Sequence, residues 1–421
     1  MPQQVTVGSS LAEGFPDRKR FGIVELFAGI GCVAHGFERT GSFEPIVLTD
    51  IDQDARDTVI ANSPCTTYLV RDVQQLKEKE ILDAAAGRSI SGILGCPPCQ
   101  GFSSAGLRDP ADERNRLLRH YFRIVRTLDP PFLVMENVPS VFRFKLFQRM
   151  LRELAPRYRF WKGIVNAALF GVPQTRQRAI VIGYRVDLGV VPSMPLPTHL
   201  GGRAIFEYTT QRLVKPSSQS GSRLLGLYPD LRREAAMLAE TMTALAKDDA
   251  RNLKNLVVVR EAIGDLPPAS DEEAELQCRK RGSGYAIELR NGLITNHVRW
   301  KHRPELLRRL RSVREGSGLL DRHGRARARP YFSQAYTRLH REGLARTVTT
   351  NFHNPGSGRF LHYDHLRTIT VREAARLQGI PDAFRFIGFQ SDQERLVGNA
   401  FPVPLAEAIA RHIQRELQAA V

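Results

Sequence analysis

The sequence predicts an α/β protein: a parallel sheet covered by helices on both faces, with a second, irregular domain inserted late in the chain. Two observations support this prediction. Up to residue 187, short apolar runs alternate with helical patterns, and such alternation is typical of parallel strands joined by helical crossovers. From residue 188 to about residue 367, turn- and linker-rich sequence replaces this pattern.

The strands of the sheet are expected at the apolar runs of the first domain. The first run, residues 21–27, ends in a glycine-rich turn, and a helical pattern follows through Arg39. Later helical patterns cover residues 52–62 and 114–128. Short apolar runs bounded by turn signals indicate buried strands. Further strands are expected at residues 45–50, 67–73, 90–95 and 131–138, and then as an antiparallel pair within 160–169 and 178–186.

The chain is expected to divide into three segments. Residues 1–187 form the first domain, residues 188–390 the inserted domain, and residues 391–421 return to the first. The last segment contains an amphipathic helix, because apolar residues recur there at every fourth position. These residues are Leu405, Ile409, Ile413 and Leu417. In sheets of this kind, ligands bind at the carboxyl ends of the strands.

Composition excludes several classes of protein. The 421 residues contain no apolar run of the ~20 residues that a membrane helix needs. The first 20 residues lack the hydrophobic core of a signal peptide, so an intracellular protein is expected. The odd number of cysteines, 5, argues against a disulfide framework and fits a reducing compartment.

The net charge points to a polyanionic partner. Lys and Arg number 61 against 44 Asp and Glu, which gives a charge of +17. Between residues 299 and 346 there are 14 basic and 4 acidic residues. Aromatic residues are interleaved with them, as on a folded nucleic-acid surface. They are Trp300, Tyr331, Phe332 and Tyr336.

Residues 27–34 (FAGIGCVA) form the glycine-rich turn after the first strand. Glycines at this place let a ligand approach the backbone and the amino end of the helix. The turn fits G-x-G-x-x-A, and Asp50 and Asp52 end the next strand, where an acceptor for ribose hydroxyls belongs. A nicotinamide dinucleotide, a flavin, an adenosyl cofactor and a purely structural turn all remain compatible with this pattern.

Residues 95–103 (GCPPCQGFS) place two prolines directly before Cys99. A zinc site would need a second ligand pair, which the isolated Cys32, Cys65 and Cys278 do not offer. A redox pair usually opens a helix, which the prolines disfavour. A buried, inert thiol is a further alternative. The prolines suit a nucleophile whose direction of approach must be held while the following loop moves.

Two further patterns lie beside strands. The segment MENV ends a strand and puts Glu136 at the ligand-binding edge of the sheet. Gln174, Arg176 and Arg178 occupy alternate positions just before a strand, so their side chains are expected to project to one side. Paired arginines bind phosphate or recognise a carbonyl.

Six segments together give the chain a close resemblance to the cytosine-C5 DNA methyltransferases, over nearly its whole length. They follow one another in the family's order and spacing. The segments are ELFAGIG (25–31), GCPPCQGFS (95–103), ENV (136–138), QTRQR (174–178), REAARLQGIPD (372–382) and GNAFPVPL (398–405).

The resemblance implies a Rossmann-like methyltransferase sheet that binds S-adenosylmethionine. Phe27 would pack on the adenine, Asp50 would bind the ribose hydroxyls and Asp72 the adenine amine. Ile51 stands where family members often have an aromatic residue, which leaves adenine with an apolar contact on that side. The implied cofactor residues are Phe27, Ala28, Gly29, Gly31, Asp50, Ile51, Asp72, Val73, Pro98, Leu117, Asn399 and Ala400.

The resemblance also implies the catalytic and DNA-contacting residues. Cys99 would attack C6 of a cytosine flipped out of duplex DNA, and the methyl group would pass to C5. Residues 1–187 would then be the catalytic domain and 188–390 the target-recognition domain. The catalytic residues would be Cys99, Glu136, Arg176 and Arg178, without a metal. The candidate DNA contacts are Gln100, Ser103, Arg299, Lys301, Arg303, Arg327 and Arg329, and a solvated charged helix is the alternative for residues 296–311.

Three other functions are weighed against this one. They are an RNA cytosine methyltransferase on the same scaffold, a nicotinamide-dependent dehydrogenase and a catalytically silent DNA-binding protein. The long insertion favours duplex DNA, and a dehydrogenase would not use Cys99, Glu136 and Arg178 together. We expect a monomeric bacterial enzyme, cytoplasmic and associated with the nucleoid, either an orphan or the partner of an independently acting restriction endonuclease.

Overall fold

The computed structural model describes residues 20–98, 117–199, 253–278, 281–318 and 335–420. These residues form two compact units, each built from separate stretches of chain. The described residues of the sheet unit lie within 1–165, 177–196 and 405–421, and those of the second unit within 166–176 and 197–404. The chain thus changes unit after residues 165, 176, 196 and 404, and not at 187 and 390, the ends of the segments expected from sequence.

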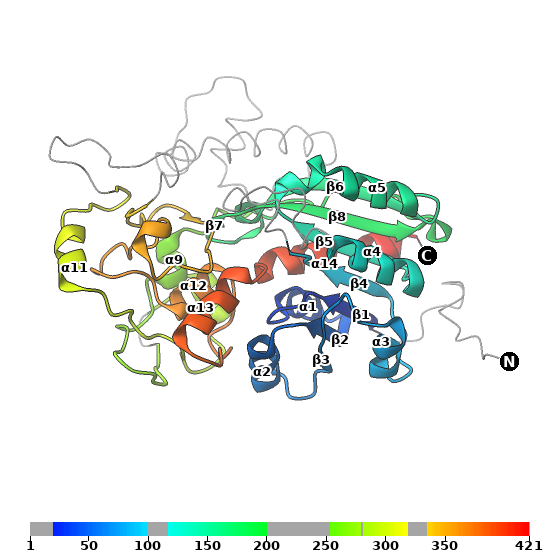
Figure 1. Cartoon of the computed structure of the whole chain (residues 1–421). Coiled ribbons are helices and arrows are strands. Elements are labelled where there is room, and N and C mark those ends of the chain that lie inside the picture. Colours follow the sequence, from blue (N-terminus) through cyan, green and yellow to red (C-terminus); the bar gives the residue numbers. More distant parts are fainter. Residues whose placement is uncertain (1–19, 99–116, 200–252, 279–280, 319–334, 421) are drawn as a thin grey trace, which may run out of the picture. The chain divides into compact units, whose positions relative to one another are not determined.

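The sheet unit is built around a seven-stranded sheet in the order β3-β2-β1-β4-β5-β8-β6 (Figure 1). The pairs β1–β2, β2–β3, β1–β4 and β4–β5 are parallel, and β5–β8 is antiparallel. The predicted α/β sheet is therefore confirmed. The strands are β1 Phe21–Leu26, β2 Phe43–Asp50, β3 Tyr68–Val70, β4 Gly92–Gly95, β5 Phe132–Asn137, β6 Tyr158–Asn166 and β8 Gln177–Arg185.

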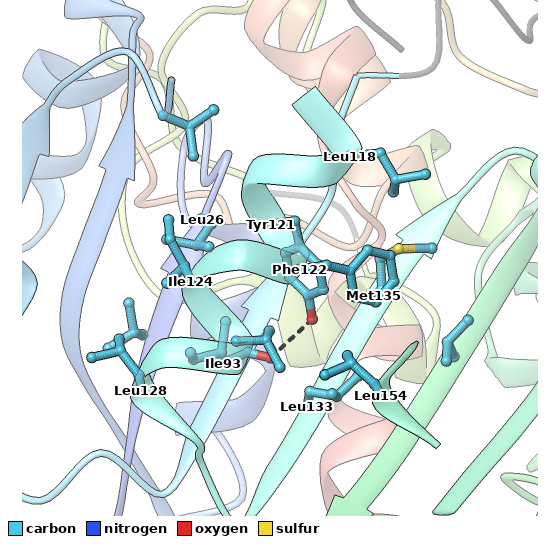
Figure 2. Packing of buried hydrophobic residues seen from close by; sticks show 14 of the residues in the cluster. Leu26, Ile93, Leu118, Tyr121, Phe122, Ile124, Leu128, Leu133, Met135 and Leu154 are labelled. Carbon is cyan, nitrogen blue, oxygen red and sulfur yellow. Dashed lines mark hydrogen bonds between the residues drawn. The ribbon is translucent and has the colours of Figure 1, made fainter. Parts of the chain in front are cut away.

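One face of this sheet packs on helices α3, α4 and α5. In α4, the buried Tyr121 lies among apolar side chains, and its hydroxyl donates to the Ile93 carbonyl at 3.3 Å (Figure 2). The same hydroxyl also donates to the Val134 carbonyl at 2.9 Å. A buried phenol needs such partners, since an unpaired hydroxyl in the core is costly. The helices are α3 Glu78–Ala85, α4 Leu117–Leu128 and α5 Lys145–Leu154.

Helices α1 and α14 are associated with the opposite face. Side chains alternate along a strand, so Glu25 and Tyr184 project away from the face that α4 covers. Glu25 bonds to the backbone of α1, and the Tyr184 hydroxyl donates to Glu416 of α14 at 2.7 Å. The expected C-terminal amphipathic helix is thus confirmed as α14. These helices and the peripheral α2 are α1 Cys32–Glu38, α2 Gln53–Asn62 and α14 Val403–Ala419.

The described residues of the second unit contain little regular structure, as the sequence predicted. Its two described strands form a parallel pair of two residues each, β7 Gln174–Thr175 and β9 Ala345–Arg346. Its helices are α9 Val259–Ile263, α10 Gly284–Leu289, α11 Pro304–Leu310, α12 Val371–Leu377 and α13 Gln390–Asn399. Single 3-10 turns in the two units are η2 Pro139–Arg143, η3 Ala167–Phe170, η4 Val186–Leu188 and η6 Pro355–Ser357.

Within the part of the chain that the structure describes, no helix has both the length and the apolar character to span a membrane.

Candidate functional site

The turn between β1 and α1 is built from residues in an unusual backbone conformation. Phe27, Gly29 and Gly31 all have positive φ, at 57°, 50° and 71°. This conformation is easy for glycine and strained for a bulky residue such as Phe27, and strain of this kind gathers at functional sites. The turn directs the backbone into the first turn of α1, as the glycine pattern predicted.

The two glycines of this turn face different surroundings. A Cβ atom on Gly31 would lie 2.7 Å from the Cδ2 of Leu48, so close packing requires a glycine there. A Cβ atom on Gly29 would meet no atom within 4 Å. Gly29 therefore borders open space at the carboxyl end of β1, where a ligand can approach the backbone closely.

Asp50, the last residue of β2, holds the turn in place. Its Oδ2 accepts the Gly29 N–H at 2.8 Å, and its Oδ1 accepts the N–H groups of Ile51 at 2.7 Å and Asp52 at 3.2 Å. The Tyr68 hydroxyl secures the other side by donating to the Gly29 carbonyl at 2.8 Å. A carboxylate has about four acceptor positions, so Asp50 keeps room for one further donor, such as a ribose hydroxyl.

Burial raises the pKa of Asp50 above its ordinary value, against the lowering effect of its backbone donors. Next to it, the side chain of Ile51 is 68% exposed. Beyond β3, Asp72 accepts the Gln74 N–H at 2.9 Å and Val73 is buried. The exposed apolar side chain that follows Asp50 offers a contact surface for a flat apolar ring.

Glu25, which sequence reasoning did not single out, is hydrogen-bonded to the helix that follows this turn. It is buried in β1, and its Oε2 accepts the Ala34 N–H of α1 at 2.8 Å. Burial raises its pKa from 4.5 to about 8. The carboxyl group is therefore largely neutral at pH 7. A carboxylate within the apolar run FGIVELF was the available signal for this residue.

The segment after β4 carries the base of the cysteine loop. The Cys96 N–H donates to the Leu26 carbonyl at 3.4 Å, and the Pro97 carbonyl accepts the Asn137 side-chain amide at 3.0 Å. Asn137 is buried and was also missed from the sequence, although it stands inside the ENV segment. The chain leading to Cys99 is thus tied to the strands on both sides, while Cys99 itself lies outside the described residues.

Glu136 and Arg178 meet at the same edge of the sheet. The antiparallel pairing of Asn137 with Ala179 places the start of β8 beside the end of β5. The Arg178 Nε lies 2.5 Å from the Glu136 Oε1, and the two side chains are only 13% and 14% exposed. The Arg178 Nη1 also donates to the Gln177 carbonyl at 2.7 Å. The structure therefore brings together two of the predicted catalytic residues.

Gln174 and Arg176 lie in the second unit and Arg178 in the sheet unit, so the expected projection of all three side chains to one side, just before a strand, is not what the structure shows. The segment is split between β7 and β8, which belong to different sheets. Gln174 donates to the Leu377 carbonyl at 2.8 Å, and the buried Arg176 donates to the carbonyls of Val348 at 3.2 Å and Ala400 at 3.1 Å. Both side chains therefore form hydrogen bonds with the backbone of the second unit. A supporting catalytic role for Arg176 stays a prediction.

The remaining predicted residues are distributed over both units. Asn399 ends α13 and Ala400 caps it, within the second unit. Leu117 begins α4 and Pro98 follows β4, both partly buried in the sheet unit. Arg299 pairs with Asp271, and Lys301 and Arg303 are exposed. Four predicted DNA contacts lie outside the described residues, namely Gln100, Ser103, Arg327 and Arg329.

The residues at the ends of β1 and β2 fit S-adenosylmethionine. The backbone of Gly29 opens on free space that a side chain would fill. Asp50 retains an acceptor position at the same edge of the sheet, and the exposed Ile51 can cover one face of an adenine ring. A glycine turn, a carboxylate on the next strand and an apolar surface are the set that an adenosyl group requires.

Comparison with known proteins shows the family. The model of the C-5 cytosine-specific DNA methylases matches residues 21–415. The chain is 30% identical over 397 residues to Type II methyltransferase M1.HphI of Haemophilus parahaemolyticus, covering 93% of this chain and 86% of that protein. It is 28% identical over 421 residues to Type II methyltransferase M.DdeI of Desulfomicrobium norvegicum, covering 93% and 88%.

A solved structure agrees with this family assignment. It is described as a DNA modification methyltransferase encoded within a prophage (E. coli), and it matches with a TM-score of 0.66 and 25% identity over 94% of this chain and 99% of its own. The family match over nearly the whole chain and the fitting cofactor residues lead to one conclusion. This chain belongs to the C-5 cytosine-specific DNA methylases and is an S-adenosylmethionine-dependent DNA (cytosine-5)-methyltransferase.

Proposed function

We propose that Cys99, Glu136 and Arg178 together activate a cytosine flipped out of duplex DNA. The observation that carries this proposal is the Glu136–Arg178 pair, with 2.5 Å between Oε1 and Nε, at the strand ends from which the Cys99 loop departs. The Asn137–Pro97 hydrogen bond of 3.0 Å ties the base of that loop to the strand that carries Glu136. A nucleophile, an acid and a carbonyl-binding group therefore leave neighbouring strands.

The chemistry requires a nucleophile because cytosine C5 is itself a poor one. When a thiolate adds to C6, C5 becomes the carbon of an enamine and can accept a methyl group. We assign this addition to Cys99. A free thiol has a pKa of about 8.5, so the site must favour the thiolate. Loss of the C5 proton and departure of Cys99 then restore the aromatic ring.

Glu136 and Arg178 would stabilise the charge that develops on the base. A carboxyl group at ring N3 and a guanidinium at O2 both stabilise the negative charge that the ring gains when the sulfur adds to it. In the structure the two groups hold each other in place before any base enters. Both are largely buried, and electrostatic interactions are stronger where water is excluded.

The cofactor would be held by the ends of β1, β2 and β3. S-adenosylmethionine supplies the electrophilic sulfonium methyl group. Gly29 and Gly31 would admit its methionine part, Asp50 would accept a ribose hydroxyl, and Phe27 and Ile51 would contact the adenine. Asp72 would accept from the adenine amine, and Asn399 is proposed as a further cofactor residue.

The second unit would bind DNA and read the sequence around the target. Flipping a base costs a few kcal/mol, which contacts to phosphates and base edges must offset. Arg303 and Lys301 are exposed and suited to this contact. Because the relatives are Type II methyltransferases, we propose that a short specific sequence is modified, by a monomer in the nucleoid of a bacterial cytoplasm, with or without a separate cognate endonuclease.

Two variants test the catalytic assignment. Cys99→Ser should leave S-adenosylmethionine binding intact and abolish methyl transfer, measured with labelled cofactor and duplex DNA. Glu136→Gln should slow single-turnover methyl transfer by about 100-fold or more, since one positioned acid contributes about 10²- to 10⁴-fold. Full transfer by the Cys99 variant would refute the nucleophile. Trapping of the wild type on DNA containing 5-fluorocytosine is the positive control.

The DNA-binding role has a separate test. Each phosphate contact that is removed should reduce the slope of log affinity against log salt by about one. Arg303→Ala should show this reduction, and Arg159→Ala, an exposed arginine of the sheet unit, is the matched control. An unchanged slope would remove Arg303 from the interface. Bisulfite sequencing of DNA from a host that expresses the enzyme would identify the target sequence.

A further inference from the structure

Cys96 lies beside Glu136 because of the strand register. Gly95 of β4 pairs in parallel with Met135 of β5, so the next residues, Cys96 and Glu136, are also neighbours. On its other side, Cys96 is tied to β1 by the N–H bond to the Leu26 carbonyl at 3.4 Å. Side chains of residues in register project from the same face of a sheet. The thiol and the carboxylate therefore share one face.

Burial and charge keep the Cys96 thiol protonated. Burial raises the pKa of this thiol well above its ordinary value, and among the charged groups Glu136 raises it most. Cys96 is partly exposed. A protonated thiol beside a carboxylate can donate a hydrogen bond to it.

Glu136 thus has a neighbour on each of the two adjoining strands. On the β8 side, the Arg178 Nε lies 2.5 Å from Oε1, and on the β4 side the register puts Cys96 next to it. If Arg178 turns to the O2 of an entering cytosine, the first contact weakens. A bond from Cys96 does not depend on Arg178 and can keep the carboxylate in its orientation.

We propose that Cys96 is a positioning residue, whose thiol donates to the Glu136 carboxylate and holds it in place for the base. The proposal rests on the proposed catalytic role of Glu136. It assigns no bond-making step to Cys96. It also separates the two cysteines of GCPPCQ by function: Cys99 attacks the base and Cys96 orients the acid.

The test compares Cys96→Ala, which removes the donor, with Cys96→Ser, which keeps one. A matched control is Cys65→Ala, which removes an exposed cysteine of the same unit. Cys96→Ala should slow single-turnover methyl transfer by about fivefold, the effect of one modest hydrogen bond. The KM values for DNA and S-adenosylmethionine should not change. Cys96→Ser and Cys65→Ala should retain the wild-type rate within about twofold.

A double-mutant cycle distinguishes positioning from simple packing. In a Glu136→Gln background, Cys96→Ala should have no further effect on the methyl-transfer rate, because the carboxylate it orients is gone. An equal loss in both backgrounds, or equal losses for Cys96→Ala and Cys96→Ser, would overturn the proposal. So would a wild-type rate for Cys96→Ala while Glu136→Gln is slow. A wild-type rate for Glu136→Gln would instead overturn the proposed role of Glu136, and this inference with it.

Discussion

The two units of this protein solve the same problem, the pairing of buried backbone groups, in different ways. In the sheet unit, a seven-stranded ladder pairs the backbone, and the apolar side chains of α3, α4 and α5 cover one face. In the second unit, the described strands are two residues long. Its buried backbone carbonyls instead accept hydrogen bonds from arginine side chains, which supply five N–H donors each.

Three buried arginines show this use. Arg372 donates to the carbonyls of Thr295, Pro381 and Phe384. Arg338 donates to those of Val313, His362 and His365. Arg376 donates to the Ala262 carbonyl at 2.9 Å. It is also fully buried between Asp265, at 2.9 Å, and Asp382, at 2.6 Å. A long side chain with a planar fork of N–H donors can form hydrogen bonds with buried backbone carbonyls that lie outside any sheet.

These buried arginines show that not every basic residue of the second unit is available for contact with DNA. Arg338 lies within the 299–346 stretch that the sequence marked as a DNA surface, yet it is only 6% exposed. In the same stretch, Arg341 pairs with Glu315 at 3.0 Å and with Asp364 at 2.6 Å. Some of the excess charge therefore serves folding, and exposed members such as Lys301 and Arg303 remain the candidates for phosphate contacts.

The largest expected loss of stability comes from changes in the two cores, the buried ion pairs of the second unit and the apolar core of the sheet unit. Arg376→Met should destabilise the second unit by about 3–5 kcal/mol, because Asp265 and Asp382 would stay buried without their partner. Hydrogen exchange should show the loss in α9, α12 and their neighbours, with the sheet unit unchanged. Leu133→Ala, which empties part of the apolar core at a cost of about 2–5 kcal/mol, should show the reverse distribution. Uniform loss across both units in either variant would contradict the comparison.

The next effect concerns the one buried carboxyl of β1. Glu25 has a folded pKa of about 8, above its ordinary value of 4.5. Its contribution to stability is therefore fully present below about pH 4.5 and is lost as the pH rises through 8. Glu25→Gln should match the wild type at pH 4 and exceed it at pH 9 by on the order of 5 kcal/mol. Urea unfolding at both pH values measures this, and a constant difference would show that Glu25 does not titrate with folding.

A smaller effect distinguishes the two glycines of the cofactor turn. Gly31→Ala combines a positive φ with a close contact to Leu48 and should cost about 2 kcal/mol of stability. Gly29→Ala meets no neighbour and should cost about 1 kcal/mol. The added methyl group of Gly29→Ala projects into the space expected for the cofactor, so calorimetry should show weaker S-adenosylmethionine binding. Unchanged binding would place the cofactor away from Gly29.

The smallest effects should be equal in the two units. Asp52 caps α2 by accepting the Asp54 and Ala55 N–H groups, and Ser283 caps α10 by accepting the Ala286 N–H at 3.1 Å. Loss of a cap costs about 1 kcal/mol wherever the helix lies. Asp52→Ala and Ser283→Ala should therefore reduce the free energy of unfolding by similar amounts. A large difference would mean that the surroundings, and not the helix end, decide the value of the cap.

Much of the sheet unit could be predicted from the sequence because its signals are local. An apolar run, a glycine turn and a helical pattern each fall within a few residues, so β1, the turn and α1 were expected in the right order. Glu136 was placed at a strand end for the same reason. The pairing of Glu136 with Arg178 was not predictable from spacing, because it depends on the antiparallel register of β5 and β8.

The sequence by itself determined the fold class, the family and the identity of the chemical groups, since periodicity and the order of motifs are properties of the chain alone. Only the tertiary structure decided which of those groups meet. It gave Asp50 a bond to Gly29, placed Cys96 against Glu136, and turned Arg176, Arg338 and Arg376 inward. The physical reason is that register and burial arise from contacts between residues far apart in the chain, which no local pattern encodes.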